Sequence, residues 1–212
     1  MAKAEQERQL TAAEQRRLEK LNSVTERLTA DGYKRTDLTI DLVKANLVLT
    51  LVSIPLYAVG VVLYFVLCGD KGRDIFGTKD VLIFFVAYFL LIIIHELIHG
   101  LTWSLYSPNH WKDIEFGFIL KTLTPYCTCG EPLKKSEYIL GALMPLIALG
   151  IIPTVIAYVI GSFTLLLIGI TMIVSAGGDI MLVLKLLRFK SGTDDYLVYD
   201  HPTEAGSVIF TR

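Results

Sequence analysis

The residues whose types and spacing point most directly to chemistry are His95-Glu96-Leu97-Ile98-His99. On an α-helix, residues i and i+4 share one face, so both imidazoles can reach a single zinc ion. Glu96 is then placed to take a proton from a water molecule that zinc makes acidic, and to return it to a leaving amine. The motif therefore predicts peptide hydrolysis, with Zn²⁺ as cofactor and Glu96 as catalytic base.

The motif lies in an apolar setting, because the segment from Val81 to Ile94 carries no charged residue. Two histidines and a glutamate within such a helix cost several kcal/mol to bury without partners, so ionisable residues inside a membrane usually mark a functional site. This setting favours a metal site over a polar contact between helices.

A catalytic zinc site usually has three protein ligands and keeps its fourth position for water or substrate. The position six residues after the second histidine, where some soluble enzymes have a third histidine, is Leu105. We therefore expect a distant ligand, and the candidate is Asp179, the only acidic residue of the last apolar segment. Glu115 and His110 are rival ligands in the loop that follows the motif.

Two glycines, Gly177 and Gly178, directly precede Asp179. Small residues let membrane helices approach closely, so we expect these two to let the short aspartate reach the metal on the neighbouring helix. Ordinary helix packing would use them equally well.

The three cysteines, Cys68, Cys127 and Cys129, are too few and too unevenly spaced for a disulfide framework, so we expect reduced thiols. A zinc site built on Cys127 and Cys129 remains open, although C-x-C lacks the usual spacing of structural zinc ligands.

The elements that must position these residues are long apolar helices. Hydrophobic residues make up 53% of the 212-residue chain, charged residues only 19%, and the mean hydropathy is +0.53, too apolar for an ordinary soluble domain. Four stretches, 45–68, 81–106, 138–160 and 163–187, are long enough to cross a bilayer. The sequence predicts a mainly α, polytopic membrane protein with about four transmembrane helices.

Proline and glycine shape the second half of this bundle. The third segment contains Pro145 and Pro153, with Gly141 and Gly150, and should be kinked. The very short Gly161-Ser162 connection predicts that the third and fourth segments form a tight antiparallel hairpin.

Basic residues in the connections predict the orientation. Nine Lys and Arg residues precede the first span, and Lys112, Lys121, Lys134 and Lys135 lie between spans two and three. Both termini should therefore be cytoplasmic, and no cleavable secretory signal is evident. His99 and Asp179 lie seven and eight residues before the cytoplasmic ends of their spans, hence about 10–12 Å below that edge. Co-ligands must share a depth in this way.

The chain divides into three parts: a cytoplasmic amphipathic segment (1–40), a four-span core (41–190) and a cytoplasmic C-terminal tail (191–212). Residues 4–28 should form an amphipathic helix with apolar residues at helical spacing, which lies on the membrane surface, against the body of the protein or free in solvent. Its apolar positions are Leu10, Leu18, Leu21, Val24 and Leu28.

The loop between spans two and three is rich in aromatic and β-branched residues over 114–123 and predicts a short β-hairpin. Proteases bind extended peptide along a strand edge, and residues 114–121 are the candidate edge, with Phe116, Phe118 and Leu120 as substrate-binding residues. A hairpin that only caps the metal cavity is an equally good interpretation.

These motifs also carry a family resemblance. A His-Glu-x-x-His helix, a β-containing insertion and a later span with an aspartate after small residues resemble the core of the site-2 proteases, although those usually have Leu-Asp-Gly at the last ligand. More closely, the motifs resemble a family of small bacterial membrane proteins classed as putative zincin peptidases, over about residues 30–190. The motifs are His-Glu-Leu-Ile-His-Gly, Pro125-Tyr126-Cys127, Glu131-Pro132-Leu133, Met144-Pro145-Leu146 and Gly-Gly-Asp. The resemblance implies zinc held by His95, His99 and Asp179, with Glu96 as base, in a bacterial cytoplasmic membrane.

The leading hypothesis is an intramembrane zinc endopeptidase whose partners are the lipid bilayer and a membrane peptide or transmembrane-segment substrate. The alternatives are a non-proteolytic metal-binding membrane protein of a regulatory or immunity type, and a small transporter or scaffold. A formal net charge of −1 gives no reason to expect a nucleic-acid partner.

Overall fold

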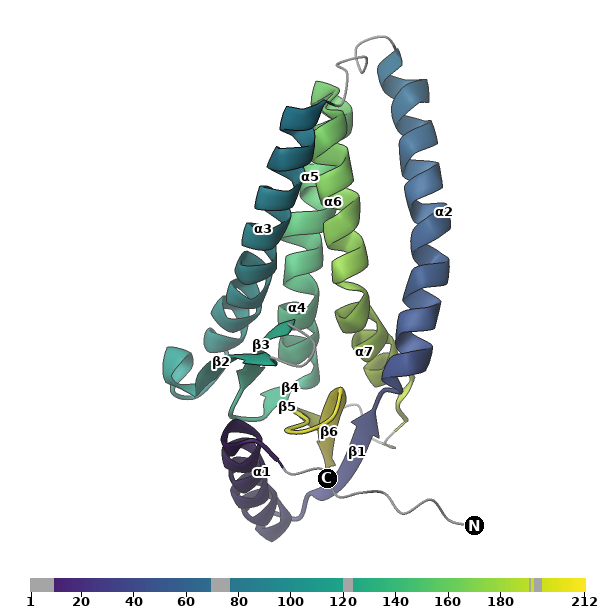
Figure 1. The fold of residues 1–212 in the computed structure, drawn as a ribbon. Coiled ribbons are helices and arrows are strands. Elements are labelled where there is room, and N and C mark those ends of the chain that lie inside the picture. Colours follow the sequence, from purple (N-terminus) through teal and green to yellow (C-terminus); the bar gives the residue numbers. More distant parts are fainter. Residues whose placement is uncertain (1–9, 70–76, 120–123, 191, 193–195) are drawn as a thin grey trace, which may run out of the picture.

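The computed structural model describes residues 10–69, 77–119, 124–190, 192 and 196–212, and shows long helices that rise from a base of short strands (Figure 1). The helices are α1 (Ala12–Ala30), α2 (Leu42–Cys68), α3 (Thr78–Ser104), the 3₁₀-helix η2 (His110–Asp113), α4 (Lys135–Pro145), the π-helix η3 (Leu146–Ile151), α5 (Ile152–Ile160), α6 (Phe163–Ser175) and α7 (Gly177–Arg188). The strands are β1 (Lys34–Thr39), β2 (Ile114–Ile119), β3 (Thr124–Cys129), β4 (Leu133–Lys134), β5 (Tyr196–Asp200) and β6 (Gly206–Thr211).

Three helices are long and apolar enough to cross a membrane: α2, α3 and the composite of α4, η3 and α5. A fourth crossing exists if α6 and α7 count as one bent span. Figure 1 shows α2 and the α4–α5 composite running away from the strands, and α3 and the α6–α7 pair running back towards them. The mainly helical prediction is confirmed, while the number of spans and their orientation stay predictions.

The third span is distorted between its two prolines, where residues 146–151 form the π-helix η3. Pro153 has no backbone N–H, and its ring displaces the carbonyl one turn earlier, so the ordinary α-helical bonding cannot continue unchanged. The predicted kink therefore takes the form of a π-helical turn. Beyond α5, Gly161 adopts φ 71°, and the Ser162 side chain caps α6, which closes the predicted tight connection.

The fourth span differs from the single helix expected over 163–187. It breaks at Ala176, and α6 and α7 meet at a bend of 43°. The two glycines that follow Ala176 have low helix propensity, so a break at this point costs little. The break makes Asp179 a residue of the first turn of α7.

The predicted hairpin between spans two and three is present as the antiparallel pair of β2 and β3, with Phe116 opposite Cys127. It packs on α3 at Gly100, where a Cβ atom would lie 2.6 Å from the Phe116 ring and 2.9 Å from the Ile114 side chain. The absence of a side chain at Gly100 therefore lets the hairpin lie directly against the motif helix.

A second sheet, with strand order β1-β6-β5-β4, was not predicted from the sequence. Residues of the expected C-terminal tail supply β5 and β6, and residues of the expected N-terminal segment supply β1. Helix α1 covers this sheet, so it lies against the body of the protein, as one of the three interpretations of residues 4–28 held; residues 4–9 fall outside the described part. The buried contact consists of Leu21, Val24 and Leu28 of α1 against Tyr199, Val208 and Phe210.

Candidate metal centre

Helix α3 places both histidines of the motif on its buried side. His95 and His99 are one turn apart, and their ring centroids are 4.8 Å apart. The opposite side of the same helix exposes apolar side chains, among them Leu97 and Leu101. The helical period thus separates an inward polar pair from an outward apolar surface, as the spacing of the motif predicts.

The break after α6 brings the third predicted ligand to this pair. Asp179 lies in the first turn of α7, where the positive end of the helix dipole favours a carboxylate. The role expected of the two glycines is wrong in detail: a Cβ atom at Gly177 would overlap Leu49 of α2, and one at Gly178 would meet no atom within 4 Å. Gly177 therefore serves the contact of α7 with α2 rather than with the motif helix.

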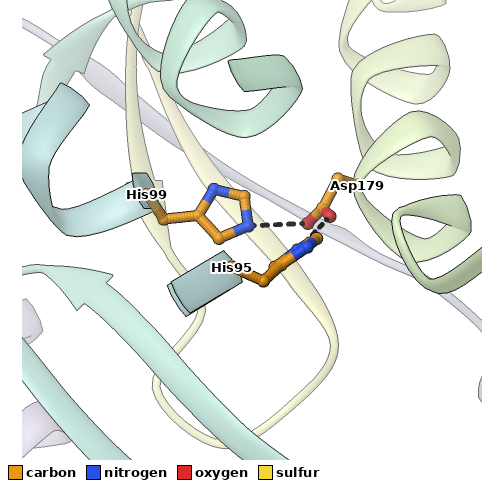
Figure 2. Close-up of side chains that lie close together, drawn as sticks. All are labelled: His95, His99 and Asp179. Atoms are coloured by element: carbon orange, nitrogen blue, oxygen red, sulfur yellow. Dashed lines mark hydrogen bonds and ion pairs between the residues drawn. The ribbon is translucent and has the colours of Figure 1, made fainter. Parts of the chain in front are cut away.

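The Asp179 carboxylate faces both imidazoles, as Figure 2 shows. Its Oδ2 atom is 3.2 Å from His95 Nε2, and its Oδ1 atom is 3.6 Å from His99 Nε2. One ligand atom from each of the three residues lies within 4.8 Å of the other two. Tetrahedral zinc with ligand bonds of about 2.0–2.1 Å holds its ligand atoms about 3.3 Å apart. The two distances between the carboxylate and the imidazoles are close to this spacing, so the three residues could hold one metal ion.

The hydrogen bonding of His99 shows why a cation fits here. His99 Nδ1 lies 2.9 Å from the Gly141 carbonyl oxygen, which can only accept, so Nδ1 carries a proton and donates it. In the neutral imidazole, Nε2 then holds a lone pair, and that lone pair faces the Asp179 carboxylate. Two acceptors in this position repel each other unless a proton or a metal cation lies between them. The donor set of two imidazoles and one carboxylate is that of a catalytic zinc site.

Aromatic stacking fixes the orientation of the His99 ring. Trp103, one turn further along α3, stacks on His99 with centroids 5.0 Å apart, and Tyr138 of α4 stacks on Trp103 with centroids 5.3 Å apart. Trp103 also donates a hydrogen bond of 3.2 Å from Nε1 to the Tyr138 carbonyl. A Cβ atom at Gly141 would overlap the indole, so this glycine is needed for the close approach of α3 and α4.

Glu96 lies next to the cluster, on the wall of a cavity of about 480 Å³. The cavity is bounded by α2, α3, α6 and β3, and the backbone N–H of Cys127 on β3 is close to the Glu96 carboxylate. The lining residues are Asn46, Tyr88, Ile92, His95, Glu96, Pro125, Met172 and Ser175. A peptide in this cavity would therefore meet Glu96 and one metal ligand together.

The predicted substrate-binding residues lie on the hairpin beside the cavity. Phe116 and Phe118 of β2 are exposed, and Phe118 pairs with Pro125, which lines the cavity. Leu120 lies outside the described residues. The structure thus places two of the three aromatic or apolar candidates on the strand next to the cavity, and their role in binding stays a prediction.

The rival ligands lie elsewhere. His110 Nδ1 is 3.0 Å from the Ser104 carbonyl, and Glu115 is half-buried on β2. Cys127 and Cys129 are free and buried, and burial raises the pKa of the Cys129 thiol to about 11, which favours a protonated thiol over a thiolate ligand. Within the described part of the chain, the group of three or more potential ligands that could hold a metal is His95, His99 and Asp179.

Several residues that shape the site were not identified from the sequence. The Gly141 carbonyl, Trp103 and Tyr138 orient His99, and Asp200 of β5 accepts a hydrogen bond of 2.5 Å from the Tyr138 hydroxyl. Backbone carbonyls carry no sequence signal. Trp103, four residues after His99, had a signal, because side chains at this helical spacing share a face.

Comparison with known proteins gives one family. The chain matches the family described as "putative zincin peptidase" over residues 88–193, which is half of its 212 residues. The matched segment contains Glu96, the three clustered residues and the β2–β3 hairpin, but not strands β1, β5 and β6. No curated protein and no solved structure matches the chain.

Proposed function

The chain belongs to the family described as "putative zincin peptidase", and from this premise we propose that it is a zinc-dependent endopeptidase that cuts membrane-embedded or membrane-associated peptides. Its active site lies within the membrane, near the cytoplasmic face, with His95, His99 and Asp179 as zinc ligands. The relation to the site-2 proteases is part of this proposal.

One observation carries the proposal: the bend at Ala176 turns Asp179 towards two histidines that lie 80 or more residues earlier in the chain, beside a cavity that Glu96 lines. A carboxylate that only joined two helices would need donors, and it faces His99 Nε2, a nitrogen that is left without a proton in the neutral ring. A cation satisfies all three groups at once.

The chemistry divides between the metal and the chain. Zinc at this site supplies a Lewis acid that lowers the pKa of a water molecule towards neutrality. Glu96 takes the proton of the attacking water and delivers it to the peptide nitrogen as the C–N bond breaks. The cavity between α2, α3 and β3 holds the peptide against Glu96 and limits the access of bulk water.

The surface of α3 supports a site at membrane depth. Around the two histidines, the outward side of the helix exposes Ile93, Leu97 and Leu101, each with 46% or more of its surface accessible. Such a continuous apolar surface on a 27-residue helix requires lipid or another apolar partner. The basic residues before α2 and between α3 and α4 favour the cytoplasm at the end where the strands lie.

Substrate access is best explained from the side of α2. The cavity beside Glu96 and a second groove of about 320 Å³ are both bounded by α2, α3 and α6. The second groove is almost wholly apolar, lined by Tyr57, Val81, Phe84, Phe85, Leu167 and Thr171. A transmembrane segment that unwinds near Glu96 would pass along this groove, and its extended part would pair with the β2–β3 hairpin.

The proposal is tested with purified wild-type protein and the Glu96→Gln variant. Glu96→Gln removes the base but none of the three proposed ligands, so it should keep about one zinc per chain, measured by elemental analysis, and lose cleavage. Cleavage is measured in host membranes that contain either protein, as new N-termini found by mass spectrometry. The wild type should generate cuts within or beside apolar segments that the variant does not.

Glu137→Gln is the matched control, because the Glu137 carboxylate caps the first turn of α4, and glutamine can serve as well in that capping position. It should behave as the wild type. If the wild type and Glu96→Gln both bind zinc and generate the same N-termini, the result would favour the non-proteolytic metal-binding alternative. A wild-type protein without zinc would contradict the proposed site altogether.

A further inference from the structure

A second, partly buried carboxylate lies in the part of the molecule that packs on the proposed metal centre. The Asp200 carboxylate, on β5, accepts a hydrogen bond of 2.5 Å from the Tyr138 hydroxyl and one of 3.1 Å from the Cys129 backbone N–H. One carboxylate therefore joins three elements: β5 of the C-terminal sheet, α4 and β3. Asp200 lies beyond the segment that matches the family.

Two of these elements hold groups that touch the proposed active site. Helix α4 carries the Gly141 carbonyl that accepts from His99 Nδ1, one turn after Tyr138. Strand β3 carries Pro125 on the cavity wall and the Cys127 N–H close to Glu96. A bond that fixes α4 and β3 to each other therefore fixes both the ligand side and the base side of the site.

The Tyr138 ring provides the direct connection to the metal centre. It stacks on Trp103, which stacks on His99. The ring is 1% exposed, so its hydroxyl has no access to bulk water and depends on Asp200 as acceptor. Without that acceptor, the ring must turn or the hydroxyl must stay unpaired, and either change reaches His99 through Trp103 and the α4 backbone.

We propose that Asp200 and Tyr138 are positioning residues for the zinc site, which hold the His99 ring in its ligating orientation from the C-terminal sheet. The inference rests on the proposed zinc site but not on proteolysis, because its main readout is the affinity for Zn²⁺. Outer partners of metal ligands typically change metal affinity by 10- to 100-fold, and Asp200 acts through two side chains, so about tenfold is expected.

The chain offers a matched control in Tyr64, at the other end of the bundle. Tyr64 is 0% exposed, and its hydroxyl donates a hydrogen bond of 2.6 Å to the Gly161 carbonyl. Tyr138→Phe and Tyr64→Phe thus each remove one buried, hydrogen-bonded hydroxyl, and a merely structural role predicts similar changes in melting temperature for both. Only Tyr138→Phe should also weaken Zn²⁺ binding.

The experiment titrates full-length, metal-free protein in detergent with Zn²⁺ and follows Trp103 emission in a Trp111→Phe background, since the sequence has two tryptophans. Tyr138→Phe and Asp200→Ala should raise the Kd about tenfold, and Tyr64→Phe should leave it unchanged. Asp200→Asn keeps an oxygen that can accept from Tyr138, so it should restore most of the affinity.

Two results would contradict these expectations. Equal Kd values for Tyr138→Phe and Tyr64→Phe would overturn the inference while leaving the proposed zinc site intact. If those equal values are both raised, the cause is a general loss of stability; if both are unchanged, the Tyr138 hydroxyl has no effect on the zinc ligands. A wild-type protein that does not bind Zn²⁺ would instead overturn the proposed function on which the inference rests.

Discussion

Asp179 and Asp200 are two carboxylates enclosed by the same half of the molecule, yet their partners are of opposite kinds. Asp200 receives an O–H donor from Tyr138 and an N–H donor from Cys129. Asp179 faces two imidazole nitrogens, and at His99 the nitrogen that faces it is the one left without a proton in the neutral ring. Asp200 is therefore satisfied by donors of the chain itself, whereas the contact between Asp179 and His99 needs a proton or a cation between the two groups.

The difference lies in how each aspartate reaches its position. Asp200 is the last residue of β5, and its pairing with Ser207 of β6 fixes its backbone. Asp179 begins a helix just after a break, and its place is set by the bend between α6 and α7. Asp200 lies in regular structure and is surrounded by donors, which indicates an architectural role. Asp179 follows an irregular backbone and faces a nitrogen that can only accept in the neutral ring, which indicates a metal ligand.

The same substitution at Asp179 and at Asp200 should have very different effects on Zn²⁺ binding. Asp179→Asn removes one of three ligands and should weaken Zn²⁺ binding by roughly 10²-fold or more, since structural zinc sites with four ligands contribute about 10–16 kcal/mol, or about 3 kcal/mol per ligand. Asp200→Asn should change the Kd only a few-fold. Isothermal titration with Zn²⁺ measures both.

Equal losses of affinity at the two positions would mean that the partner chemistry does not distinguish a ligand from an architectural carboxylate. Retention of one zinc per chain by Asp179→Asn, at unchanged affinity, would remove Asp179 from the ligand set and return Glu115 and His110 to consideration.

Sequence reasoning reached Asp179 and missed Asp200 for a physical reason. An acidic residue within an apolar helix is conspicuous because burying it costs several kcal/mol, and the helical rise alone gives its depth. Asp200 lies in a short polar and aromatic stretch near the C-terminus, where a charged residue is unremarkable. Its burial depends on pairing of β5 with β6 and on cover from α1, contacts that span most of the chain.

The elements of the fold also differ in whether local sequence patterns could predict them. Long apolar helices and the hairpin after α3 could be predicted, because periodicity and composition act locally. The four-stranded sheet could not, since its strands come from both ends of the chain, and β1, with the sequence Lys34-Arg35-Thr36-Asp37-Leu38-Thr39, has little strand-forming composition. The break at Ala176 was also missed, because two glycines in a membrane helix are as compatible with close packing as with a bend.

A smaller effect tests whether the position of Asp179 depends on the start of α7. Gly177→Ala would push a methyl group into Leu49 of α2, whose side-chain end can move in part, and should destabilise the protein by about 1 kcal/mol and weaken Zn²⁺ binding. At Gly178 an added methyl group meets open space, and alanine is the better helix former. Gly178→Ala should therefore leave the free energy of unfolding unchanged or raise it by up to about 1 kcal/mol.

Thermal unfolding and Zn²⁺ titration of the two alanine variants check this pair. Weaker binding by Gly178→Ala than by Gly177→Ala would show that a flexible backbone beside Asp179, rather than the contact with α2, sets the ligand position.

The smallest effect concerns the protonation of Asp200. Burial raises the pKa of its carboxyl above the ordinary value of 3.8, with Tyr138, Cys129, His99 and Arg17 as the neighbouring groups. A raised pKa in the folded state means that the folded protein holds this proton more tightly than the unfolded chain. The resulting stabilisation is complete below the ordinary pKa and is lost as the pH rises through the folded pKa.

An asparagine side chain does not titrate in this range. The difference in melting temperature, wild type minus Asp200→Asn, should therefore decrease as the pH is raised from 4 to 8. Both proteins are kept free of zinc with a chelator and share every other titratable group, so the change in the difference reports Asp200. A difference that stays constant over this range would mean that Asp200 is ionised at its ordinary pKa. The two hydrogen-bond donors would then hold a charged group, and Asp200 would resemble Asp179 in charge while differing from it only in the kind of partner.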